Sequence, residues 1–203
     1  MITGPKYKIA RRLGAPIFEK TQTQKYALNL EKKSKNRKGF SKPKSEFGTQ
    51  LNEKQKARFI YGLGERQFSN YVKEALSKKT SHAPQLIFEF LESRLDNVVY
   101  RLGFTSTRSA SRQMVSHGHI KVNGRKVDTP SMRLKIGDKV EINDRSLNKP
   151  LFKDLEEKMK NSTVPSWLKF DFGKKLGEVQ GKPVLVKAEN MFDLNTVIEF
   201  YSR

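Results

Sequence analysis

The chain of 203 residues carries 41 Lys and Arg against 21 Asp and Glu, a net charge of +20. Such a charge makes the compact state repel itself unless a polyanion lies against it, so nucleic acid is the expected partner. Hydrophobic residues make up only 35% of the chain, which predicts a thin core. No apolar run approaches the roughly 18 residues of a membrane span, and no secretory signal is recognisable, so we expect no membrane partner. The lack of cysteine excludes disulfides and thiolate metal sites.

Residues 1–45 form a basic N-terminal arm with 13 Lys and Arg and two acids. Its apolar residues are scattered and prolines interrupt it, so burial cannot offset the conformational entropy lost on ordering. We expect the arm to be largely disordered in the free protein and to become ordered on RNA. A solvated tail without a function is the alternative. The expected RNA contacts in the arm are Arg11 and Arg12.

Residues 46–91 are predicted to form a helical body. Apolar residues recur at helical spacing from Leu51 to Tyr61, from Phe68 to Leu76 and from Leu86 to Leu91, with glycines between the first two segments. At that spacing the aromatic residues are expected in the core and not on a stacking platform. Polar side chains off the apolar stripes are candidate RNA contacts, and they are Lys54, Gln55, Arg58, Arg66 and Lys73.

Residues 92–143 are predicted to form two short helices followed by a small antiparallel sheet. The apolar stripe from Leu95 to Leu102 has the period of a helix, and Arg94, Asn97 and Arg101 repeat on another face, predicted to be an exposed cationic stripe. Gly103 ends this helix. Ser106 or Thr107 is expected to cap a second helix that ends at Gly118 and directs Arg108 and Arg112 outward.

The sheet is indicated by alternating apolar residues. Ile120 and Val122 lead into Asn123-Gly124, the dipeptide best suited to a type I′ hairpin, and the strand around Val127 follows. A last run, Val140 and Ile142, predicts a further strand.

The sequences RLDNVVYRLGF from Arg94, TRSASRQMVSHGHIKVNGRKV from Thr107 and the pattern P-S-x-x-L-x-x-G-D-x-V-x-I from Pro130 resemble a small RNA-binding module. The module is named after small-subunit ribosomal protein four, and RNA-modifying enzymes and some tRNA synthetases also contain it. The flanks resemble the ribosomal protein family itself. They are GPKYKIARRLG from Gly4, EKQKARFIYGLGERQFSNYVKEA from Glu53 and the terminal VIEFYSR.

This resemblance implies an α+β fold, a mostly helical body with the RNA-binding module inserted into it. The C-terminal segment 144–203 is then expected to pack back on the body. Within this segment the apolar spacing from Phe152 to Met159 predicts a helix, and alternation predicts short strands at 184–186 and 197–201. Many relatives bind zinc through four cysteines in the N-terminal region, and this chain has none of them.

The resemblance further implies a structural protein of the small ribosomal subunit, in a cytoplasmic or organellar ribosome. It would bind the 5′ domain of 16S-type rRNA, nucleate assembly of the subunit body and contact ribosomal protein five. With proteins five and twelve it would influence translational accuracy, and messenger RNA entering the ribosome is a further expected partner. Within the module the candidate RNA contacts are Arg94, Asn97, Arg101, Arg108, Arg112, Gln113, Ser116, His117, Lys121, Asn123 and Arg125.

Two other functions compete with this interpretation. Arg94-Leu95-Asp96 resembles the sequence around the catalytic aspartate of one class of pseudouridine synthases, but Leu95 belongs to the apolar stripe and no segment is long enough for a separate catalytic domain. We therefore expect no enzyme, and no cofactor. His117 and His119 lack further ligands at metal-binding spacing, so we expect no metal. A free-standing RNA chaperone with the module is the second alternative.

Overall fold

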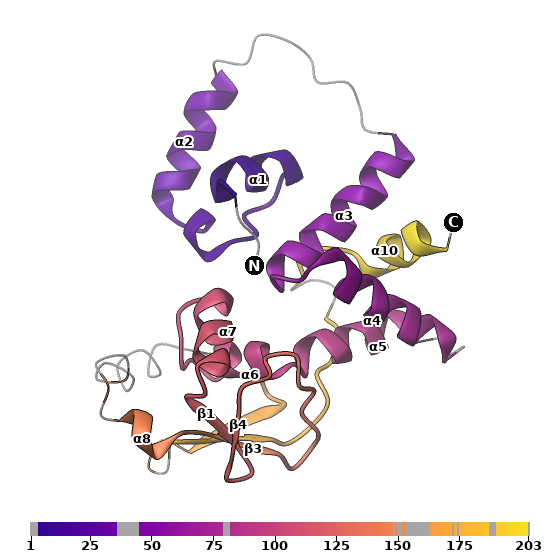
Figure 1. The fold of residues 1–203 in the computed structure, drawn as a ribbon. Helices are drawn as coiled ribbons and strands as arrows, with labels where there is room; N and C mark the ends of the chain where they lie inside the picture. Colours follow the sequence, from indigo (N-terminus) through magenta and orange to yellow (C-terminus); the bar gives the residue numbers. More distant parts are fainter. Residues whose placement is uncertain are drawn as a thin grey trace. The chain divides into compact units, whose positions relative to one another are not determined.

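The computed structural model describes residues 4–35, 45–78, 82–147, 149, 152, 163–171, 173, 175–186 and 190–202. The chain divides into two compact units, Met1–Ile87 with Leu185–Arg203, and Phe88–Val184. Helices form the described part of the first unit, and the second combines helices with a five-stranded antiparallel sheet (Figure 1). The predicted α+β class is therefore confirmed.

The N-terminal arm is mostly helical between residues 4 and 35. Its elements are α1 (Lys6–Leu13), the 3-10 helix η1 (Glu19–Thr21) and α2 (Gln24–Lys35). Gly14 ends α1 in the left-handed conformation with φ 72°, which a residue without a side chain adopts at little cost. Tyr7 of α1 and Tyr26 of α2 lie 5.3 Å apart between ring centroids, and Figure 1 shows α1 in indigo and α2 in violet.

The expectation of a largely disordered arm is wrong for residues 4–35. Buried side chains of the arm meet Phe59 of α3 (Glu46–Ile60) in one apolar cluster. The arm contributes Ala10, Leu13, Ile17, Phe18 and Tyr26 to this cluster. Apolar residues that look scattered in the sequence are thus brought together by packing against the body, which the periodicity within the arm could not show.

The body contains α3, α4 (Glu65–Ser77), the start of α5 (Ala83–Glu92), which crosses into the second unit, and α10 (Leu194–Tyr201). The three helices predicted for residues 51–91 are confirmed, with longer bounds. The strand expected at 197–201 is wrong, because Asp193 caps a helix there by accepting a hydrogen bond from the Asn195 backbone N–H at 3.0 Å.

α10 packs against α3 and α4 through aromatic side chains. Phe200 lies 5.5 Å from Phe47 between ring centroids, and Tyr201 lies 6.3 Å from Phe68. Burial raises the pKa of Tyr201, and its hydroxyl donates to a carboxylate oxygen of Glu65 at 2.9 Å, which raises this pKa further. The C-terminal helix is therefore part of the helical body.

In the second unit two short helices precede the sheet, α6 (Leu95–Arg101) and α7 (Arg108–Ser116). The strands are β1 (Ile120–Val122), β2 (Arg125–Val127), β3 (Lys139–Ile142), β4 (Leu168–Asp171) and β5 (Leu176–Val179). Their order is β2-β1-β3-β5-β4, with every neighbouring pair antiparallel. A one-turn helix, α8 (Asp144–Leu147), follows β3.

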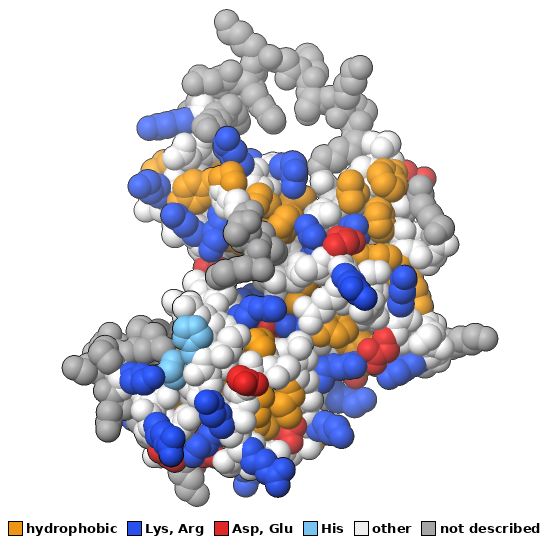
Figure 2. All heavy atoms as spheres, in the orientation of Figure 1, with side chains coloured by type: hydrophobic (Ala, Val, Ile, Leu, Met, Phe, Trp, Pro, Cys, Tyr) orange, Lys and Arg blue, Asp and Glu red, His pale blue; other side chains and the backbone are white. Residues whose placement is uncertain are grey.

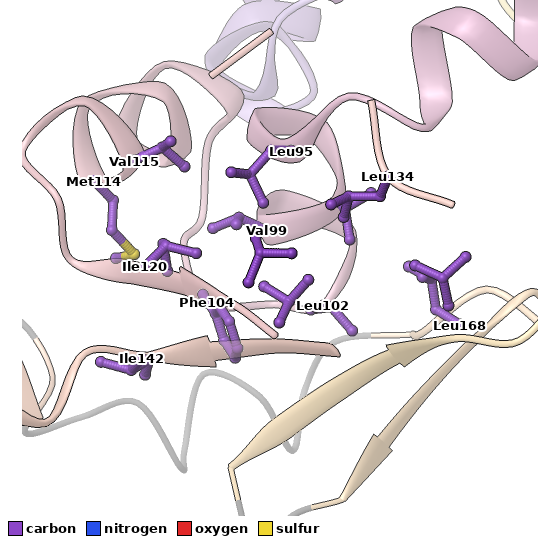
Figure 3. Close-up of a cluster of buried hydrophobic side chains, with 14 of the residues drawn as sticks. Leu95, Val99, Leu102, Phe104, Met114, Val115, Ile120, Leu134, Ile142 and Leu168 are labelled. Atoms are coloured by element: carbon purple, nitrogen blue, oxygen red, sulfur yellow. The ribbon is translucent and has the colours of Figure 1, made fainter. Parts of the chain in front are cut away.

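The core of this unit lies between the two helices and one face of the sheet (Figure 3). Leu95 and Val99 of α6, Leu102 just after it, and Met114 and Val115 of α7 point toward it. Alternate strand residues such as Ile120 and Ile142 complete the cluster from the sheet. The period-2 and helical patterns of the sequence thus correctly predicted which side chains are inside.

The C-terminal half of the sheet was not predicted. β4 and β5 extend the sheet to residue 179, so these residues belong to the second unit. Residues 184–186 form no strand, and Val184 is 69% exposed. Of the helix expected from Phe152 to Met159, only Phe152 lies among the described residues, where it is buried.

We predict that Gly177→Ala destabilises the second unit by about 1–3 kcal/mol. A Cβ at this position would lie 2.4 Å from Cδ1 of Leu102, a core side chain with 0% exposure that has little room to move. Urea unfolding followed by the fluorescence of Trp167, the only tryptophan, measures the change. Gly181→Ala is the matched control, because its Cβ would meet an atom only at 3.9 Å. Equal stability of the two variants would contradict this packing.

Candidate RNA-binding surface

α7 presents a polar face because its start and end are fixed by local signals. The hydroxyl oxygen of Thr107 accepts a hydrogen bond from the Ala110 backbone N–H at 3.2 Å, and Gly118 takes φ 69° just beyond the helix. Met114 and Val115 face the core, which leaves the other side of the helix to solvent. Exposed or partly exposed on that side and at the end of the helix are Arg108, Arg112, Gln113, Ser116 and His117.

A buried carboxylate, that of Glu92 at the end of α5, joins α5 to both short helices. It accepts bonds from Nε of Arg101 at 2.9 Å and from Nη2 at 2.8 Å, a bidentate pair, although Glu92 is only 1% exposed. Asn97 donates to the same carboxylate at 2.9 Å, and its own oxygen accepts from Nε of Arg108 at 2.8 Å. Arg108 on α7 is therefore held indirectly by an acid on α5.

Asp96 is a second buried carboxylate, between two arginines. Nε and Nη2 of Arg94 donate to its two oxygens at 3.0 and 2.8 Å, and Arg94 is 0% exposed. Nη1 of Arg112 lies 3.6 Å from Oδ2 of Asp96. The Arg94-Leu95-Asp96 sequence thus forms a structural ion pair that also attracts the guanidinium of Arg112.

These contacts correct the prediction of an exposed cationic stripe on α6. Arg94 and Asn97 are buried, so neither side chain can touch RNA directly in this structure. Arg101 is 34% exposed at its side chain and pairs with Glu92. Most of the polar face of α6 is turned toward α5 and α7, because Glu92 of α5 binds Asn97 and Arg101 and Asp96 of α6 faces Arg112 of α7.

The β1–β2 hairpin supplies the second basic element of the surface. Asn123 and Gly124 both take positive φ, 50° and 76°, as a type I′ turn requires, which confirms the predicted hairpin. The Asn123 side chain donates to Asp138 at 2.8 Å and accepts from the Lys139 backbone N–H at 2.9 Å, so it holds the turn against β3. Arg125 is exposed in the hairpin.

The two lysines of the hairpin differ in their surroundings. Lys121 and Lys126 lie opposite each other in the register of β1 and β2. Lys121 pairs with Asp144 at 2.5 Å and its side chain is 20% exposed, whereas Lys126 is exposed. The stem of Lys126 passes over Gly118, where a Cβ would come within 2.1 Å of its Cε. Lys126 was not among the predicted contacts, and its position opposite Lys121 in the register could have indicated it.

The two histidines of the module have different roles. Nδ1 of His119 lies 2.9 Å from the Ser146 hydroxyl, and its ring packs edge-on against Phe152 at 5.9 Å. Burial lowers the pKa of His119, and Lys149, His117 and Lys126 lower it further. His119 is therefore a structural residue, whereas His117 is exposed beside α7.

In the first unit the predicted contacts are dispersed. Lys54 is 6% exposed, lies 2.7 Å from Glu65 and is 4.3 Å from the centre of the Phe200 ring, so in this structure its charge is paired inside the helical body. Arg58 lies 3.5 Å from Glu65, with its side chain 20% exposed. The side chains of Gln55 and Arg11 are partly exposed. Those of Arg12, Arg66 and Lys73 are exposed.

Seven of the predicted residues, together with Lys126, follow one another along the chain from α7 into the hairpin. We call this set the α7–hairpin surface: Arg108, Arg112, Gln113, Ser116, His117, Lys121, Arg125 and Lys126. Figure 2 shows basic side chains gathered over this module on the face in view. Guanidinium groups, amides and hydroxyls in such a set suit phosphate oxygens and 2′-hydroxyls, so the surface can bind RNA without reacting with it.

Among the described residues, no group of three or more His, Asp or Glu side chains could hold a metal ion. In the same part of the chain no helix has the length and apolarity that a bilayer span requires.

Two family models match the chain and together cover its first two thirds. The Ribosomal protein S4/S9 N-terminal domain matches residues 1–92, and the S4 domain matches residues 93–140. The second match spans α6, α7, β1 and β2, which include the α7–hairpin surface, and ends within β3. These matches define a class, the ribosomal proteins with an S4 domain, and confirm the resemblance that the sequence motifs indicated.

Bacterial relatives extend the match over nearly the whole chain. A protein of Herpetosiphon aurantiacus is 40% identical over 214 residues, covering 99% of this chain and 98% of the relative. Proteins of Persephonella marina and Aquifex aeolicus are 39% and 40% identical, each over 98% of this chain and 97% of the relative. All three are named small ribosomal subunit protein uS4, and this chain belongs to that family. The family is one of structural ribosomal proteins, which confirms the prediction that the chain is not an enzyme.

We predict that Asp96→Ala destabilises the second unit by about 3–5 kcal/mol, because it leaves the guanidinium of Arg94 buried without its carboxylate. Urea unfolding followed by Trp167 fluorescence measures the loss. The double variant Arg94→Met with Asp96→Leu removes both charges and should recover most of it. A single variant as stable as the wild type would show that the pair does not hold the module together.

Proposed function

We propose that the chain is a structural component of the small subunit of a bacterial-type cytoplasmic ribosome and binds the 5′ domain of its rRNA. The observation that carries the proposal is the α7–hairpin surface. Two of its arginines, Arg108 and Arg112, are positioned by the buried carboxylates of Glu92 (through Asn97) and Asp96, and the surface lies within the S4 domain match. A surface whose cations are positioned before binding loses less conformational entropy when phosphates bind.

The mode of binding that fits this surface is recognition of RNA shape. Arg108 is 4.4 Å from the centre of the Tyr100 ring and hydrogen-bonded to Asn97, so its guanidinium plane is fixed on two sides. Arg125 and Lys126 extend the positive charge beyond the helix. Contacts of this kind fix the position of RNA helices through backbone phosphates and 2′-hydroxyls and involve no chemical reaction.

The assembly role follows from the two units together. We propose that the basic N-terminal arm and the module each bind rRNA, and that one protein with two RNA-binding parts brings RNA segments together early in assembly of the subunit body. The charge of both parts supports RNA binding by each of them. The arm has 13 Lys and Arg against two Asp and Glu, and the module from 92 to 143 has ten Lys and Arg against five Asp and Glu.

The finer parts of the proposal come from the family resemblance. We propose contact with small-subunit ribosomal protein five, an influence on translational accuracy together with proteins five and twelve, and contact with messenger RNA where it enters the ribosome. The RNA contacts proposed in the first unit are Arg11, Arg12, Gln55, Arg58, Arg66 and Lys73. The RNA contacts proposed in the second unit are the residues of the α7–hairpin surface, together with Arg101 and Asn123 beside it. The buried residues Arg94, Asn97 and Lys54 act by positioning their neighbours.

We predict that Arg125→Glu with Lys126→Glu weakens rRNA binding at least tenfold at moderate salt without changing stability, since both side chains are exposed. The salt dependence of binding should also flatten, by somewhat under one unit of log–log slope for each lost phosphate contact. Filter binding over a salt series measures both.

Arg108→Glu with Arg112→Glu should lose affinity and stability together, because these arginines also interact with Asn97 and Asp96. Unchanged affinity of the hairpin variant would contradict the surface.

We also predict that the chain sediments with small ribosomal subunits in high salt at one copy per subunit. Contacts through two units persist in salt that removes loosely bound basic proteins. Quantitative mass spectrometry across a sucrose gradient measures the ratio. Release in high salt would instead support the free-standing RNA chaperone.

A further inference from the structure

A groove of about 1210 Å³ lies in the N-terminal arm, between α1, η1 and α2. Its apolar part is formed by small or apolar side chains, with Ala10 and Ala15 on one side and Ala27 and Leu30 of α2 on the other. This volume exceeds the roughly 300–1,000 Å³ of a small-molecule pocket. The groove therefore has room for an extended ligand.

α2 leaves much of its apolar surface without cover in this structure. Tyr26 is its one buried residue among those whose side chains are described. Leu28 and Leu30 are 53% and 44% exposed. A helix that buries so little of its own apolar surface gains stability when a ligand covers that surface.

The rim of the groove is basic. Lys8, Arg11 and Arg12 line it, and no Asp or Glu does. Within the described part of the chain Lys8 and Arg12 form no ion pair, and Arg11 uses Nε to donate to the Tyr7 carbonyl at 3.2 Å. Figure 2 shows basic side chains flanking apolar ones over this arm. The rim therefore favours an anionic ligand, and a neutral apolar peptide would leave its three cations without counter-charges.

We propose that this groove binds unpaired nucleotides of the small-subunit rRNA, with bases against Ala27 and Leu30 and phosphates on Lys8, Arg11 and Arg12. The proposal rests on the rRNA-binding function above and adds the kind of RNA that the arm recognises. A duplex keeps its bases stacked inside, whereas splayed bases of a loop or bulge can enter an apolar groove while their phosphates remain at a basic rim.

A matched pair of variants on α2 tests this. Leu30→Glu places a charge in the groove, and Leu28→Glu places the same charge on the same helix outside the residues that line it. With the full chain and its rRNA, Leu30→Glu should weaken binding about tenfold more than Leu28→Glu, as expected for loss of about one base contact. Unpaired nucleotides that the wild type protects from 2′-hydroxyl acylation should become reactive with Leu30→Glu alone.

A further variant, Ala27→Trp, narrows the groove without adding a charge. Ala27→Trp should weaken rRNA binding while the salt slope stays unchanged, whereas Arg12→Gln should flatten the slope. Circular dichroism shows whether Leu30→Glu folds. If it does not fold, Ala27→Trp tests the groove in its place.

Three results would overturn the proposal. Equal affinities of the Leu30→Glu and Leu28→Glu variants, with Ala27→Trp binding like the wild type, would exclude the groove while leaving the rRNA-binding function intact. Full rRNA affinity together with loss of a neighbouring protein from reconstituted subunits would assign the groove to a protein. Failure of the wild-type chain itself to bind the rRNA would overturn the proposed function, and the groove proposal with it.

Discussion

The second unit depends on two acids buried at the junction of three helices, Glu92 and Asp96. A guanidinium such as that of Arg94, 0% exposed, could not be buried without a partner, because desolvation of an unpaired charge costs several kcal/mol. A buried pair adds little net stability over a well-packed apolar pair, so its contribution here is better assigned to geometry. Glu92 fixes Asn97 and through it Arg108, while Asp96 attracts Arg112. The acids thus determine where the arginines of α7 lie.

Local signals allowed much of this module to be predicted from the sequence. Thr107 caps α7, Gly103 and Gly118 end their helices with positive φ, and Asn123-Gly124 forms the hairpin. Each of these depends on the conformation of two to four neighbouring residues, which the residue types restrict strongly. The apolar stripe of α6 likewise faces the core as its period requires.

Three of the failures share a cause, since each depended on a partner distant in the sequence. The helical period correctly placed Arg101 on the polar face of α6. It could not show that the carboxylate of Glu92, nine residues earlier, would pair with the Arg101 guanidinium. Phe59 gathers the scattered apolar residues of the arm into a cluster, and no pattern within residues 1–45 contains it. β4 and β5 are four residues each, too short for alternation to distinguish them from a loop until β3 is available to pair with.

The pairing of acids also determines what the chain presents to its surroundings. Of the 21 acids, Glu92 and Asp96 are buried beside arginines, and Glu65 and Asp144 hold lysines at 2.7 and 2.5 Å. An acid that is already paired with a structural cation does little to neutralise the remaining basic residues. The groove in the arm and the hairpin are therefore strongly basic in places where the fold supplies few counter-charges. In water such surfaces repel themselves, and contact with phosphates both removes that repulsion and releases counterions from the RNA. The distribution of the acids thus has two consequences. Inside each unit the acids form ion pairs, and on its surface the remaining unpaired cations favour binding of a polyanion.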